Sequence, residues 1–123
     1  MKRKIKISAG KVELEAWLNE TNTATKVFEA LPITSTVNTW GDEIYFAIPV
    51  DAKPEDAKEL VNLGDIAYWP PGKAMCIFFG KTPISRGDEI RPASAVNIIG
   101  KVEGDYRSLK KVKDGEEITI RSP

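Results

Sequence analysis

Residues 64–80 read GDIAYWPPGKAMCIFFG, and this stretch decides the fold. Ile66–Trp69 and Ala74–Phe79 are short runs of apolar, aromatic and β-branched residues, as is typical of buried strands. Two prolines and a glycine at positions 70–72 separate the runs, and these residues do not suit the interior of a strand. The stretch therefore predicts two consecutive strands joined by a tight break.

More strands are predicted on both sides of this pair. Apolar and polar residues alternate in two N-terminal segments that are joined at Ala9-Gly10-Lys11, which predicts a hairpin. A turn at Gly41-Asp42 precedes a strand in which Ile44, Phe46 and Ile48 alternate with Tyr45 and Ala47. The strands predicted outside residues 64–80 are Lys4–Ile7, Val12–Leu18, Thr34–Trp40, Glu43–Val50, Ala95–Val102 and Glu117–Ile120.

Two short helices are predicted between the strands. The first begins at the capping pair Asn22-Thr23, has Val27, Phe28 and Leu31 at helical spacing, and ends at Pro32. The second is Pro54–Leu63, which has acidic residues in its first turn. A helical turn is also expected at Asp105–Leu109.

Short strands, frequent glycine and proline breaks and few helices indicate a mainly β protein, either a closed barrel or a sandwich. Neither a linker nor a repeat divides the chain, so one domain is expected over residues 1–123. The side chains expected in its core are Ile66, Ile77 or Phe78, Ile98, Val102 and Ile118.

Composition excludes several kinds of chemistry. The 123 residues include no histidine and one cysteine, Cys76, so histidine-based catalysis, zinc sites and an internal disulfide are not expected. The formal net charge is zero, which does not favour a nucleic-acid partner. The basic cluster Lys2-Arg3-Lys4, with Lys6, alternates with Ile5 and Ile7 and predicts the solvent face of a first strand.

The same sequence has no apolar run long enough to span a membrane and no signal-peptide pattern, so a cytoplasmic protein is expected, with no cofactor. Glutamine is absent and lysine and glutamate together number 24, a composition typical of heat-adapted proteins.

Several segments, in order, resemble cyclophilins. Gly64–Trp69 and Ile77-Phe78-Phe79 resemble a family strand pair, of which the second strand carries two phenylalanines. Val96–Gly104 resembles the family's segment of valine, phenylalanine, glycine, lysine, valine and glycine, and Glu117–Ile120 its last strand. Tyr45–Pro49 resembles the strand with the catalytic arginine. Trp69–Gly72 and Ile77–Pro83 also resemble a group of small prokaryotic cyclophilin-like proteins of uncharacterised function. The resemblance covers roughly residues 14–120 and implies a closed antiparallel barrel.

The resemblance also implies a ligand pocket with altered residues. Phe46 occupies the position of the arginine that cyclophilins use on the prolyl nitrogen. Cys76 or Ile77 replaces the family's glutamine, and Val96 or a neighbour replaces its histidine. The paired phenylalanines place Phe79 at the pocket.

Two further aromatic residues join this pocket. The alignment sends Trp69 to it, and Tyr45 supplies a hydroxyl. Trp69 capping the barrel end, Phe79 packing only in the core, and Tyr45 as an ordinary surface residue are the alternatives. Arg86 and Arg91 flank a long loop, either as solvated charges or as cations at the pocket mouth. Asp42 and Glu43 are adjacent on a strand and diverge, which favours a simple hairpin turn.

Three functions follow as hypotheses. The first is a binding module that holds a prolyl or hydrophobic peptide, or a small apolar ligand, in an aromatic pocket, with weak or no isomerase activity. The residues expected to bind the ligand are Tyr45, Phe46, Trp69, Ile77, Phe79 and Val96. The second is an atypical peptidyl-prolyl isomerase. The third is an accessory subunit of a larger enzyme, which a large exposed apolar patch would support.

Overall fold

The computed structural model describes residues 3–123, so Lys2 lies outside the described residues. Its helical elements are α1 (Asn22–Glu29) and the 3-10 helices η1 (Pro70–Gly72) and η2 (Tyr106–Lys111). The strands within this range are β1 (Arg3–Ala9), β2 (Val12–Leu18), β3 (Ile33–Thr36), β4 (Asn38–Thr39), β5 (Glu43–Ala47), β6 (Asp65–Trp69), β7 (Ala74–Phe78), β8 (Asn97–Glu103) and β9 (Glu117–Arg121).

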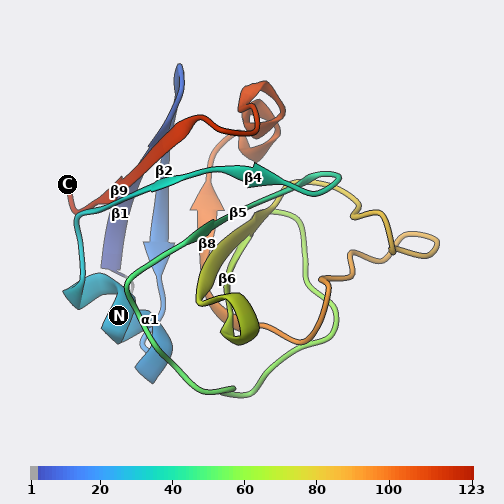
Figure 1. Cartoon of the computed structure of the whole chain (residues 1–123), viewed down its shortest axis with the longest axis horizontal. Coiled ribbons are helices and arrows are strands. Elements are labelled where there is room, and N and C mark those ends of the chain that lie inside the picture. Colours follow the sequence, from blue (N-terminus) through green and yellow to red (C-terminus); the bar gives the residue numbers. More distant parts are fainter. Residues whose placement is uncertain (1–2) are drawn as a thin grey trace.

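The strands form a nearly closed antiparallel barrel, which confirms the predicted fold class (Figure 1). Their order is β3-β9-β1-β2-β8-β6-β7-β5-β4. The two ends of this order, β3 and β4, follow one another along the chain and are separated only by Val37. The backbone of Val37 pairs with that of residues 115 and 116, so one continuous segment closes the barrel against β9 and β5.

The barrel interior is filled by alternate residues of the strands, as the period of two requires. Phe46 pairs with Met75 across β5 and β7, and Tyr68 pairs with Met75 across β6 and β7. All three side chains are fully buried. The Tyr68 hydroxyl donates to Val50 O at 2.7 Å, so its polar atom has a partner inside the core.

One core prediction is off by a residue. Ile99 is fully buried, whereas Ile98 is only partly buried and packs on the outer side of the barrel. The cause is a register shift between β6 and β8: Ile66 faces Gly100, but Ala67 faces Ile98. An extra residue in one strand reverses the faces beyond it, and a simple alternation cannot predict such a bulge.

The predicted first helix is confirmed, but its N-cap is Thr21, one residue before the predicted capping pair Asn22-Thr23. The helix predicted over Pro54–Leu63 is wrong. This segment is irregular, and isolated bridges tie Lys58 to Val96 and Val61 to Ile90. Its backbone groups bond with distant parts of the chain instead of with one another, so tertiary contacts override the helical spacing.

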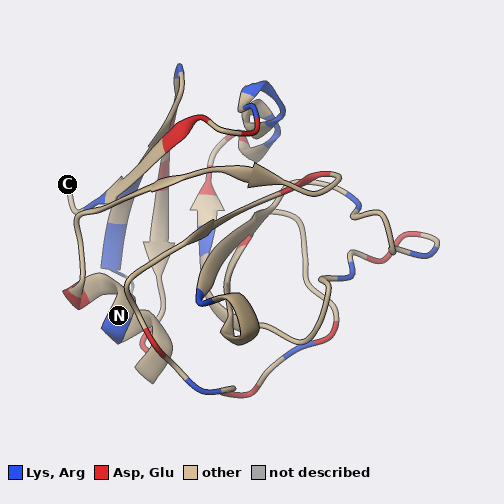
Figure 2. Cartoon of the chain, in the orientation of Figure 1, with Lys and Arg blue, Asp and Glu red and all other residues tan. Residues whose placement is uncertain are grey.

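A second apolar layer lies outside the barrel, under the segments that connect β5 to β6 and β7 to β8. Its buried members are Val61, Ala67, Cys76, Phe78, Ile90 and Val96. Figure 2 shows basic and acidic residues interspersed along the chain. Among the helices of residues 3–123, none combines the length and apolar character needed to cross a membrane.

Candidate functional site

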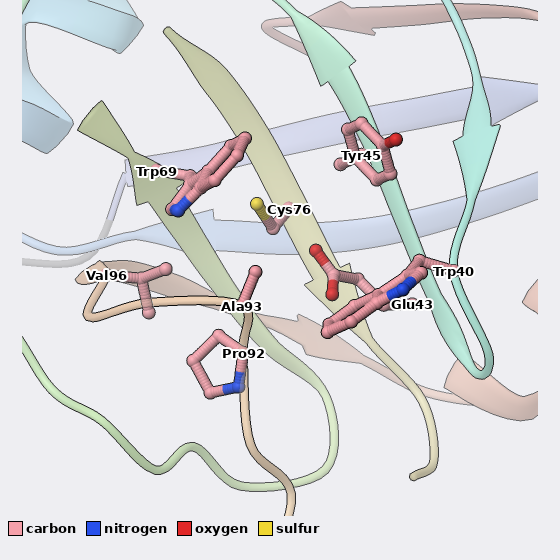
Figure 3. A pocket seen from close by; sticks show the side chains of 8 residues that line it. All are labelled: Trp40, Glu43, Tyr45, Trp69, Cys76, Pro92, Ala93 and Val96. Atoms are coloured by element: carbon pink, nitrogen blue, oxygen red, sulfur yellow. The ribbon is translucent and has the colours of Figure 1, made fainter. Parts of the chain in front are cut away.

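A cavity of about 250 Å³ opens on the outer face of β5, β6 and β7. We call it the outer cavity. Its lining residues are Trp40, Glu43, Tyr45, Trp69, Cys76, Pro92, Ala93 and Val96 (Figure 3). Its lining is mainly aromatic and apolar, with one carboxyl group. The volume is slightly below the roughly 300–1,000 Å³ of drug-sized sites, so it suits a single ring or a compact group.

Strand pairing brings the floor of the outer cavity together. Tyr45 faces Cys76 across β5 and β7, and Cys76 faces Ala67 across β7 and β6. In this row of three residues Cys76 and Ala67 have small side chains, whereas Tyr45 beside them has a large one. Trp69 lies one step further along the same face of β6, because alternate residues share a face. The result is a hollow with an aromatic ring on either side.

A hairpin turn supplies the second tryptophan and the carboxyl group. Trp40 and Glu43 exchange backbone hydrogen bonds at 2.9 and 3.2 Å, which confirms the predicted turn. Gly41 adopts a φ of +60°, and a Cβ there would lie 2.8 Å from Pro83 Cδ. The turn is therefore packed tightly against the loop that follows β7.

The loop from residue 80 to residue 96 forms the opposite wall. Ser85 Oγ accepts hydrogen bonds from the backbone N–H groups of Thr82 and Arg91, each at 3.1 Å, so the base of the loop is closed. Beyond it, Ser94 Oγ accepts a hydrogen bond from Trp69 Nε1 at 2.7 Å. This contact fixes the indole of Trp69 against the loop.

Glu43 is the unusual member of the lining. Only 5% of its surface is exposed, and its Oε1 atom has no hydrogen-bond partner within the described residues. Figure 3 shows its carboxyl group pointing into the space between the three aromatic side chains, toward Cys76. Burial raises the pKa of Glu43 from 4.5 to about 7, and hydrogen bonding with the Cys76 thiol opposes this rise.

Cys76 is buried beside this carboxyl group. Burial raises the pKa of its thiol well above the usual value, and the Glu43 carboxylate raises it further. The thiol therefore stays protonated near neutral pH and is not an activated nucleophile. In the described part of the chain, no three cysteine or carboxylate side chains gather to hold a metal ion.

The structure brings three of the six predicted ligand-binding residues together. Tyr45, Trp69 and Val96 line the outer cavity. Phe46 on β5, Ile77 on β7 and Phe79 just after β7 do not, because their side chains pack in the barrel core. These three side chains therefore take no part in the outer cavity, and their role at a ligand stays a prediction.

The sequence interpretation missed Trp40, Glu43, Pro92 and Ala93 as lining residues, and of the two candidates for the glutamine position it is Cys76, not Ile77, that lines the cavity. The alternation that separates Tyr45 from Phe46 also places Glu43 on the face of Tyr45, and this signal was available. The position of the loop residues carries no comparable signal, because it depends on tertiary contacts.

Neither arginine of the long loop lines the outer cavity. Arg91 forms an ion pair with Glu89, with Nε 2.8 Å from the carboxylate, and borders a neighbouring cavity. Arg86 is exposed. Within residues 3–123, no lysine or arginine is among the residues that line the outer cavity.

The fold and site together define a small antiparallel β-barrel with an aromatic cavity on its outer face. The chain belongs to the cyclophilin-like family, whose model matches residues 3–121. It is similar to the solution structure of a hypothetical protein from Archaeoglobus fulgidus, with a TM-score of 0.83 and 47% identity over 99% of this chain and 95% of that one.

A more distant similarity concerns the fold alone. The structure of McbB in complex with tryptophan matches with a TM-score of 0.71 and 14% identity. The match covers 96% of this chain and 44% of McbB, so the chain spans less than half of that protein. Among curated proteins, no match to the chain was found.

Proposed function

We propose that the chain is a binding module that holds an apolar ring in the outer cavity. The ring is either a prolyl or aromatic side chain of a peptide or part of a small free ligand. The single observation that carries the proposal is the cavity itself, which has Trp40, Tyr45 and Trp69 around it and lies outside the core. Concave sites with aromatic walls and few polar groups are the usual form of ligand sites.

The shape of the outer cavity supports one ring rather than a long apolar chain. Its floor is the short side chain of Cys76, and its walls are the half-buried indoles. Flat rings stack on aromatic walls with a gain of about 0.5–1.5 kcal/mol per pair beyond the burial of area. Because the Trp69 indole is already held by Ser94, little side-chain entropy is lost on binding.

The isomerase hypothesis has less support. A donor that stabilises the twisted amide is the main requirement of that reaction. The side chain at the expected arginine position, Phe46, is buried in the core, and Glu43 and Tyr45 are the polar groups nearest the cavity that could replace it.

The accessory-subunit hypothesis calls for a large exposed apolar patch. The large hydrophobic residues exposed within residues 3–123 are Leu60, Leu63 and Ile84. These three side chains give the accessory-subunit hypothesis little support, so we favour the binding module.

NMR titration tests this proposal. The ¹⁵N-labelled chain is titrated with indole and, separately, with a proline-containing tetrapeptide. We expect saturable shift changes at the backbone amides of the lining residues in at least one titration. McbB, which shares the fold, was solved with tryptophan, but indole is chosen for its fit to the cavity.

Two matched variants complete the experiment. Trp69→Ala removes a wall and should weaken binding at least about tenfold, in line with the cost of losing a buried aromatic contact. Trp17→Ala also removes a tryptophan, but Trp17 lies on β2 and does not line the outer cavity, so affinity should be kept. Shift changes confined to another surface, or equal effects of the two variants, would contradict the proposal.

A further inference from the structure

A buried carboxyl group without a counter-charge needs an explanation. Glu43 takes part in none of the ion pairs formed within residues 3–123, the Oε1 atom lacks a partner, and no cation lines the outer cavity. Removing a carboxylate from water is costly unless a partner compensates. A glutamate at this position does not serve the packing of the barrel, because it faces the outer cavity and not the core.

The rings around Glu43 have a complementary property. Trp40, Tyr45 and Trp69 come from the hairpin turn, β5 and β6, and Figure 3 shows them on different sides of the carboxyl group. The face of an aromatic ring carries partial negative charge and attracts cations, most strongly for tryptophan. Rings and carboxylate therefore favour the same sign of charge in one small, poorly hydrated space.

We propose that the ligand of the outer cavity carries a protonated or quaternary amine, whose positive charge binds against Glu43 among the rings of Trp40, Tyr45 and Trp69. This inference rests on the proposed binding function and names the chemical class of the ligand. The apolar substituents of the amine contact Val96 and Pro92, and the ammonium group supplies the counter-charge that Glu43 lacks within the chain.

The ionisation of Glu43 should make the binding of the amine depend on pH. With a pKa of about 7, Glu43 is mostly protonated at pH 6 and mostly ionised at pH 8. The other titratable groups of the lining are Tyr45 and the Cys76 thiol, which stays protonated in this range because burial raises its pKa.

Charged groups on the adjoining elements do not neutralise Glu43. The Asp42 carboxylate in the same turn lies against Gly80, where a Cβ would meet it. Arg91 in the facing loop pairs with Glu89. Binding of a cation should therefore rise with pH, by about an order of magnitude between pH 6 and pH 8, and should release a proton near pH 7.

Choline and its neutral isostere 3,3-dimethylbutan-1-ol provide the test, because they have nearly the same shape and differ in charge. Isothermal titration of the 123-residue chain at pH 8 should give choline an affinity at least about tenfold higher than that of the alcohol. Repeating the titration at pH 7 in buffers of different ionisation enthalpy should reveal proton release with choline and none with the alcohol.

A matched pair of variants assigns the preference to one side chain. In Glu43→Gln the ratio of the two affinities should fall several-fold, to the smaller preference that the rings alone give, and the pH dependence should disappear. In Glu117→Gln, an exposed glutamate on β9, the ratio and the pH dependence should stay as in the wild type.

The outcomes separate the two proposals. If indole or the tetrapeptide binds but choline binds no better than the alcohol, the binding function stands and the amine inference is overturned. The amine inference is also overturned if Glu43→Gln keeps the choline preference and its pH dependence unchanged. If indole, the tetrapeptide and choline all fail to bind, the binding function is overturned and the inference with it.

Discussion

The side-chain oxygen of Asn97 accepts a hydrogen bond from the backbone N–H of Glu55 at 2.8 Å, across 42 positions of the sequence. The Asn97 amide also donates to Lys53 O at 2.9 Å and to Thr23 Oγ1 at 3.1 Å. The Glu55 carboxylate in turn accepts hydrogen bonds from the first backbone N–H groups of α1, at 3.0 and 2.9 Å. One buried amide thus joins β8, α1 and the irregular segment that follows β5.

Replacing this amide tests its contribution to stability. Asn97→Ala leaves the Lys53 carbonyl and the Glu55 N–H without their partners, and each such loss costs about 1–3 kcal/mol. We expect the free energy of unfolding, measured in urea, to fall by about 2–4 kcal/mol. Asn62→Ala, at an exposed asparagine, is the control and should change it by less than about 0.5 kcal/mol. Similar values for the two variants would contradict this role.

Glu43 should make stability depend on pH in the direction opposite to an ion-paired carboxylate. Its pKa is raised from 4.5 to about 7 on folding, so the folded state holds the proton more tightly than the unfolded state. Stability is therefore lost as pH rises from about 4.5 to 7 and is constant above that.

The variant Glu43→Gln removes this dependence. Each unit by which the pKa differs between the folded and unfolded states corresponds to about 1.4 kcal/mol. The unfolding free energy of Glu43→Gln, minus that of the wild type, should therefore rise by about 2–3 kcal/mol between pH 5 and pH 8. Chemical denaturation at the two pH values measures the change, with Glu117→Gln as the control. A difference that stays flat with pH would show that Glu43 titrates normally.

The turn at Gly41 should be more sensitive to a methyl group than its backbone angle alone implies. Gly41 and Gly87 have similar φ values, +60° and +58°, but only at Gly41 would a Cβ meet other atoms, including Lys81 O at 2.9 Å. Gly87→Ala should cost about 1 kcal/mol for the left-handed conformation, as is usual. Gly41→Ala should cost at least about 1 kcal/mol more, because the loop must move.

Thermal unfolding of the two glycine variants measures this difference. Ligand affinity gives a second readout, because the turn at Gly41 positions Trp40 and Glu43. Gly41→Ala should weaken the binding of indole or choline, whereas Gly87→Ala should not. Equal melting temperatures for the two variants would show that the contact with the loop is loose.

Prolyl isomerase activity should be far below that of an ordinary cyclophilin. Loss of one donor to the transition state typically lowers the rate by about 10²–10³. The expected arginine position holds Phe46, which packs in the core. In a protease-coupled assay with a proline-containing tetrapeptide we expect a rate close to the spontaneous one. Turnover near that of ordinary cyclophilins, abolished by Tyr45→Phe, would assign a donor role to the Tyr45 hydroxyl instead.

Most strands, the N-terminal hairpin and the first helix could be predicted because each depends on local alternation, caps and turns. Two sequence signals disagreed about the side chain of Phe46 on β5. Counting from Ile48-Pro49 by resemblance places Phe46 at the ligand, whereas the alternation along the strand groups Phe46 with the aliphatic side chains of Ile44 and Ile48. The alternation was right, since the pleat of a strand decides which side chains share a face.

The rest depended on contacts between distant segments. The bulge that exchanges Ile98 for Ile99, and the bridges that replace a helix over residues 54–63, both arise from partners far away in sequence. The wall formed by Pro92 and Ala93 has the same origin, because Ser85 and Ser94 position that loop only after folding. Local patterns carry no information about such partners.

The use of both faces of β5 and β7 has a consequence for how the protein can diversify. Inward residues such as Phe46 and Ile77 support the barrel, while outward neighbours such as Tyr45 and Cys76 shape the cavity. A scan of all substitutions along these two strands, selected separately for folding and for ligand binding, should show two interleaved patterns with a period of two. Substitutions at every second position of these strands can therefore reshape the cavity, while the residues between them keep the barrel core unchanged.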